Sequence, residues 1–183
     1  AGYYRFALGG EDLDRLIAET DSGTLKASGF TKLIPLDVRH AEGLTTGESH
    51  AYEVKLHEPA SSVRVTLAWS DAPPYSEFKG HPIVNDLDLI VKDAAGQRIW
   101  PPGSDGQEDR RNSVEQVTAT DLSGSFTVEV VGAHVPVAPR AKAGQGYALV
   151  IWTSGKAERN PALVKKSGTS APVTEYAPPS APP

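Results

Sequence analysis

The middle of the chain alternates between apolar and polar positions. In residues 62–69 every second side chain is apolar, from Val63 to Trp69, which is the period of a strand with one face buried. Residues 147–152 are apolar at nearly every position, as expected of a strand buried on both faces. The segments that alternate are 52–56, 62–69, 87–91 and 126–130. Loops rich in Gly, Pro, Asp and Ser separate them, so the sequence predicts an all-β fold, an antiparallel β-sandwich or jelly roll.

The pattern changes at both ends of the chain, which divides it into three parts. Residues 1–35 are a mixed segment in which Leu13, Leu16 and Ile17 have helical spacing, so a short helix is predicted over 11–19. Residues 36–155 form the predicted β-sandwich domain. Residues 156–183 are a Pro/Ala/Ser-rich tail or linker, predicted to be disordered because few of its side chains can be buried.

Composition excludes several classes of protein. The formal net charge is −5, which argues against a nucleic-acid partner because phosphate binding needs a basic surface. No apolar run approaches the roughly 20 residues of a membrane-spanning helix. The chain has no cysteine, so disulfides, thiol catalysis and thiolate metal sites are excluded.

Acidic side chains are densest around Asp86 and Asp88. Residues two apart on a strand share a face, so both carboxylates project the same way and repel unless a positive charge lies between them. Calcium binds six to eight oxygen atoms, and loops at one end of a sandwich can supply them. The candidate metal ligands are Asp71, Asp86, Asp88, Asp109, Asn112 and Glu115.

A structural role would account for the same side chains. Asp and Asn commonly cap loops by accepting hydrogen bonds from backbone amides, and Arg98, Arg110 and Arg111 are near enough in sequence to form ion pairs. Spacing alone leaves both interpretations open, because no EF-hand pattern is present.

Five segments of the chain resemble, in order, the C-terminal domain of subtilisin-like (subtilase) serine proteases of the alkaline, oxidatively stable type. They are Leu67-Ala-Trp-Ser-Asp-Ala-Pro73, Ile83-Val-Asn-Asp-Leu-Asp-Leu-Ile-Val91, Asp109-Arg-Arg-Asn-Ser-Val-Glu-Gln-Val117, Gly124-Ser-Phe-Thr-Val-Glu-Val130 and Val135-Pro-Val137. The resemblance covers roughly residues 48–152. It implies a P-domain-like jelly roll that binds Ca²⁺, a secreted protein, and a subtilisin-like catalytic domain as partner, in the same polypeptide or as a processed chain. The family often has paired Asn where this chain has Asn112-Ser113, so a ligand from the second Asn would be missing.

The expected function is therefore that of a non-catalytic accessory domain, which stabilises the catalytic unit or docks on it. Ser170 lies in a motif similar to that of a subtilisin nucleophile, but it is in the Pro-rich tail and no apolar helix follows it, so no catalytic residue is assigned. The alternative is a lectin-like or protein-binding jelly-roll module. Trp100 is its candidate contact, because it stands beside a Gly/Pro loop.

Overall fold

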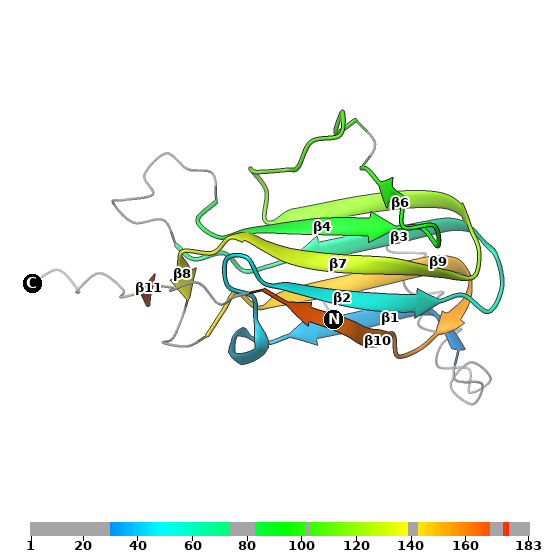
Figure 1. Ribbon diagram of the computed structural model, residues 1–183, viewed down its shortest axis with the longest axis horizontal. Helices are drawn as coiled ribbons and strands as arrows, with labels where there is room; N and C mark the ends of the chain where they lie inside the picture. The colour runs from blue at the N-terminus through cyan, green and yellow to red at the C-terminus, as the bar shows by residue number, and fades with distance from the viewer. Residues whose placement is uncertain (1–29, 74–82, 102, 139–142, 169–173, 176–183) are drawn as a thin grey trace, which may run out of the picture.

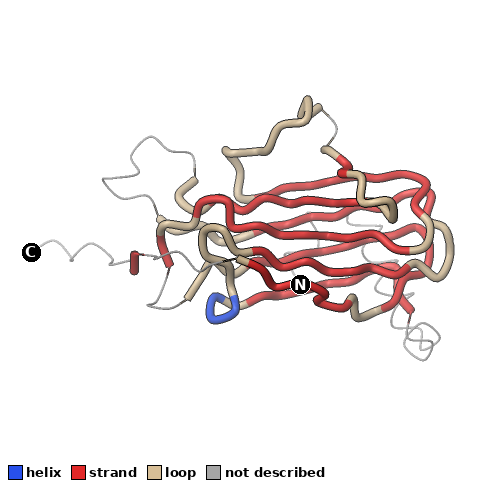
Figure 2. The backbone as a smooth tube through the Cα atoms, viewed as in Figure 1, coloured by secondary structure: helices blue, strands red, loops and turns tan. Residues whose placement is uncertain are grey.

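A computed structural model describes residues 30–73, 83–101, 103–138, 143–168 and 174–175. The predicted helix over 11–19 and Ser170 lie outside these residues. Within them nearly all regular structure is strand, with one 3₁₀ turn, η2 (His40–Glu42), and no α-helix (Figure 2). The strands, in chain order, are β1 (Phe30–Val38), β2 (Ser49–Lys55), β3 (Ala60–Ala68), β4 (Asp86–Lys92), β5 (Arg98–Ile99), β6 (Val114–Leu122), β7 (Ser125–His134), β8 (Val137–Ala138), β9 (Tyr147–Glu158), β10 (Ala162–Ser167) and β11 (Thr174–Glu175).

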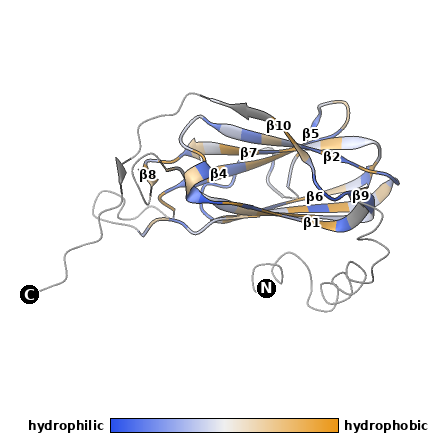
Figure 3. Ribbon diagram, turned by 90° about the horizontal axis from the view of Figure 1, so that it is seen from below, coloured by the Kyte–Doolittle hydropathy of each residue, from blue (hydrophilic) through white to orange (hydrophobic). Residues whose placement is uncertain are grey.

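Two antiparallel sheets pack face to face, which confirms the predicted β-sandwich (Figure 1). One has four strands in the order β1-β9-β3-β6, and the other has five in the order β10-β2-β7-β4-β5. Figure 3, turned by 90°, shows the sheets as two layers. A separate parallel pair joins β11 to β8.

The core lies between the layers and is formed by the apolar positions of the alternating segments. Val63, Val65 and Leu67 of β3 face it, each at most 1% exposed. Leu87 and Leu89 of β4 face it from the other sheet, at 0% and 2% exposed. Alternation puts the intervening residues of each strand on the outer faces of the sheets. The acidic residues of β4 therefore lie on the outer face of that strand.

The sheets extend past the predicted limits of the sandwich at 36 and 155. β1 begins at Phe30, and residues 156–167, which the sequence assigned to the tail, belong largely to β9 and β10. β10 pairs with β2 although Leu163 and Val164 are about half exposed. In the part of the chain that is described, no helix is long and apolar enough to cross a membrane.

Candidate metal centre

Asp86 and Asp88 lie on the outer face of β4, opposite the core-facing Leu87 and Leu89. Both aspartates are nevertheless 7% exposed, so the two carboxylates are buried side by side. This is the shared face that the alternation predicts. Like charges held together in a place with little water need a positive partner.

Glu115 comes from β6, at the edge of the other sheet. It has the same orientation along β6 as the buried Val117 and Ala119, and it is 8% exposed. Its Oε2 accepts a hydrogen bond from the backbone N–H of Leu89 at 2.6 Å. Because β5 pairs with β4 only from Val91 onward, this carboxylate caps a part of the β4 edge that β5 leaves open. β4 and β6 lie side by side there (Figure 1).

These three carboxyl groups form the acidic cluster: Asp86, Asp88 and Glu115. One oxygen from each lies within 4.8 Å of the others, a spread that fits three oxygens around one divalent cation. Asp86 Oδ1 and Glu115 Oε1 are buried and have no hydrogen-bond partner. A buried carboxylate oxygen without a partner costs free energy, so this donor set, made only of oxygen, suits a hard cation. The cluster could hold a metal ion.

Arg110 supplies the positive charge beside the cluster. Its Nη1 donates to Asp86 Oδ2 at 2.5 Å and to Asp88 Oδ1 at 2.9 Å. The guanidinium offsets one carboxylate charge of the cluster, and its side chain remains 49% exposed. In the sequence, Arg110 is only one of several possible ion-pair partners. The repulsion between Asp86 and Asp88 was the signal that some cation belongs there.

Burial shifts the ionisation of the cluster. Loss of solvent raises the pKa of Glu115 to about 8, against the opposing effect of the hydrogen bond from Leu89 N–H. Loss of solvent likewise raises the pKa of Asp88 to about 6, although the attraction of Arg110 lowers it. The ionised forms are therefore disfavoured here, and a bound divalent cation would restore them.

Asp71 caps a loop. Its Oδ1 accepts from the backbone N–H groups of Ala72 and Asn85, both at 2.8 Å, and its Oδ2 accepts from that of Val84 at 2.7 Å. Its carboxylate is thus used in joining the end of β3 to the start of β4. The capping role fits Asp71 better than a metal ligand.

Asp109 and Asn112 lie in the exposed loop before β6. Asp109 Oδ1 accepts from the N–H of Arg111 at 2.9 Å, and Oδ2 accepts from Asn112 Nδ2 at 2.7 Å. They are outside the acidic cluster. Asp109 does line a pocket of about 370 Å³ together with Glu108 and Glu115, so it stands beside the access to the cluster.

Trp100, the candidate for sugar stacking, is 37% exposed and packs against Arg98. The Arg98 guanidinium carbon lies 3.6 Å from the centre of the ring system. The two terminal nitrogens of Arg98 also donate hydrogen bonds to the Glu108 carboxylate, at 2.7 and 2.8 Å. One face of the indole is thus covered by an arginine that is itself held in place.

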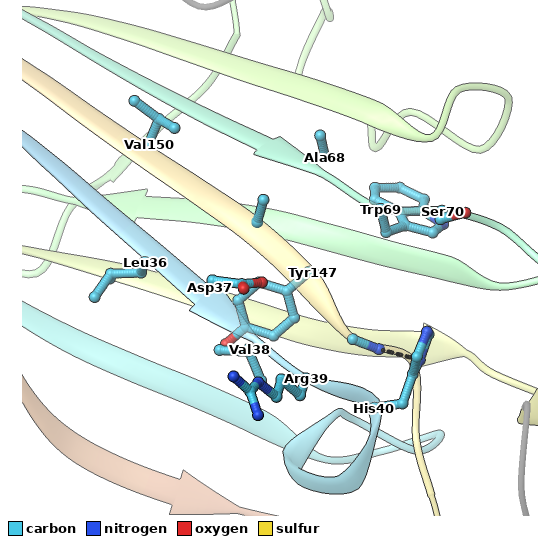
Figure 4. A pocket seen from close by; sticks show the side chains of 12 residues that line it. Leu36, Asp37, Val38, Arg39, His40, Ala68, Trp69, Ser70, Tyr147 and Val150 are labelled. Atoms are coloured by element: carbon cyan, nitrogen blue, oxygen red, sulfur yellow. Dashed lines mark hydrogen bonds between the residues drawn. The ribbon is translucent and has the colours of Figure 1, made fainter. Parts of the chain in front are cut away.

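A groove of about 720 Å³ is lined by the end of β1, the start of β9 and residues 68–70 at the end of β3 (Figure 4). His40 lines it, and its Nδ1 accepts a hydrogen bond from the backbone N–H of Gly146 at 3.0 Å. The dashed line in Figure 4 marks this contact, which ties η2 to the loop before β9. His40 therefore has a structural role in this groove.

No family model matches the chain, and no curated protein matches its sequence. Within the described residues, the acidic cluster is therefore the feature of this chain that points most directly to a function.

Proposed function

We propose that this chain is a calcium-binding, non-catalytic accessory domain of a secreted subtilisin-like serine protease. The observation that carries the proposal is the acidic cluster, with three buried carboxyl groups on two strands and two oxygen atoms without partners. Three carboxylates suit Ca²⁺, which accepts irregular arrangements of six to eight oxygens, with water and backbone carbonyls completing the shell.

The positions of four of the five resembling segments support the same proposal. Residues 83–91 and 109–117 supply all three acids of the cluster and Arg110. Residues 67–73 and 135–137 are joined to the first of them, because Asp71 caps Asn85 and Asn85 Nδ2 donates to Val137 O at 2.8 Å. Segments scattered over 70 residues of sequence thus make contact at one end of the sandwich, around the acidic cluster.

Calcium binding is tested by thermal unfolding after exhaustive chelation. A ligand at a hundredfold excess over its Kd stabilises the folded state by about 2.7 kcal/mol, and this raises the Tm of a domain of this size by about 5–11 °C. Calcium should restore the higher Tm, and magnesium should do so poorly because it requires tight octahedral geometry. Asp88→Asn should reduce the response, and Glu53→Gln, on a different strand, should leave it unchanged. Identical unfolding curves with and without calcium would contradict the proposal.

The accessory role has two tests of its own. The purified chain should not hydrolyse casein and should not react with a fluorophosphonate probe, and labelling that disappeared in Ser170→Ala would overturn this part. The coding sequence upstream of Ala1 should encode a subtilisin-like catalytic domain. An unrelated domain there would remove the protease assignment and leave the calcium proposal standing.

A further inference from the structure

Arg110 contacts two of the three carboxyl groups that a cation bound to the acidic cluster would use. Its Nη1 donates to one carboxylate oxygen of Asp86 and one of Asp88, the two aspartates of the candidate site. A divalent cation among the same carboxyl groups would meet both the competing donor and its positive charge. Two like charges a few ångströms apart repel strongly where water is scarce. It is therefore unfavourable for the cation and the Arg110 guanidinium to lie against the same carboxyl groups together.

The surroundings of Arg110 allow its guanidinium to leave without unfolding the loop. Its side chain is half exposed, so it can rotate into solvent at little cost in buried surface. The loop has other anchors that do not involve Arg110. They are the paired hydrogen bonds of Arg98 with Glu108 and the contacts of Asp109 with Arg111 N–H and Asn112.

We propose that Arg110 is an exchangeable internal counter-ion, which holds Asp86 and Asp88 in the ion-free protein and is displaced into solvent when a divalent cation binds. The inference rests on the proposed function, because it assigns a regulator to the same site. The competition keeps the cluster folded without the ion and lowers its affinity for the ion. Ion binding is also transmitted to the surface, since it frees a cationic side chain beside the pocket lined by Glu108 and Asp109.

Calcium titration calorimetry on the chelated protein tests the competition. Arg110→Gln should bind Ca²⁺ about tenfold more tightly than the wild type, or tighter still, because a unit charge a few ångströms from the ion is removed. The same variant should be less stable than the wild type without calcium and should gain more from it. Arg111→Gln is the matched control, because it removes the same charge from an exposed neighbour in the same loop. Its affinity should stay close to that of the wild type.

Arginine-specific labelling with phenylglyoxal, read by mass spectrometry, tests the displacement directly. Calcium should increase the labelling rate of Arg110 and leave that of Arg111 unchanged. If the wild type and Arg110→Gln bind calcium equally well, or if calcium leaves Arg110 labelling unchanged, the exchange is overturned and the calcium site stands. If neither protein binds calcium, the proposed function fails and the exchange fails with it.

Discussion

Glu115 Oε2 lies 2.6 Å from the backbone nitrogen of Leu89, so a carboxylate on the edge strand of one sheet caps the edge of the other. The contact closes the sandwich where β5 is too short to cover β4. It also leaves Glu115 Oε1 buried without a partner, close to Asp86 and Asp88. One side chain thus joins the two layers and completes the acidic cluster.

Glu115→Gln should separate these two roles. The amide keeps an oxygen acceptor for Leu89 N–H but removes a buried charge, so the chelated protein should be as stable as the wild type or more stable. The stabilisation by calcium should fall severalfold, because one anionic ligand is lost. Urea unfolding with and without calcium measures both effects, and Glu53→Gln is the control. An unchanged calcium response would remove Glu115 from the site.

The ion-free protein should lose stability as the pH rises from about 4.5 to about 8. Over this range the folded state keeps protons that the unfolded state has released, because burial raises the pKa of Glu115 from 4.5 to about 8 and that of Asp88 from 3.8 to about 6. A carboxyl with a raised pKa in the folded state contributes stability at low pH, and the contribution is lost as the pH passes through the folded-state value. Urea unfolding in chelator at pH 5 and pH 8.5 measures the loss. Calcium should reduce it, and a stability that fell with pH as steeply in Glu115→Gln as in the wild type would contradict the assignment.

Asp71→Ala should destabilise the protein by about 1–3 kcal/mol, because it leaves backbone N–H groups at Ala72, Val84 and Asn85 without their acceptor. Calcium affinity, measured on the folded variant by calorimetry, should not change. A large loss of affinity together with a small loss of stability would return Asp71 to the list of metal ligands.

Tyr147→Phe should destabilise the protein by about 1–3 kcal/mol because it breaks a polar network inside the core. The Tyr147 hydroxyl lies 2.8 Å from both His50 Nδ1 and the Tyr52 hydroxyl, and all three side chains are buried. Tyr52→Phe should cost less, because it removes only one of these two contacts. Equal unfolding free energies for the two variants, measured in urea, would show that the network does not contribute as its geometry indicates.

Three strands have an irregular local pattern, and the apolar alternation does not predict them. β1 contains Pro35, which a central strand rarely tolerates, and β1 lies at the edge of its sheet. β10 also lies at an edge, exposes Leu163 and Val164, and is found in a Pro-rich part of the chain. β6 carries a glutamate at a core-facing position, which interrupts the apolar alternation. Each is held by pairing with a neighbour distant in sequence.

Sequence alone determined the fold class and the shared face of Asp86 and Asp88, because alternation with a period of two is a local property of a strand. It also identified Glu115 as a candidate, along with Asp71, Asp109 and Asn112. Only the tertiary structure decided which candidates meet. Glu115 lies 26 residues beyond Leu89 and belongs to the other sheet, so its approach depends on how the layers pack. The tertiary structure also decided that Arg110 contacts the two aspartates. Arg110 lies in a loop, so the contacts of that loop set the direction of its side chain, and no local periodicity predicts it.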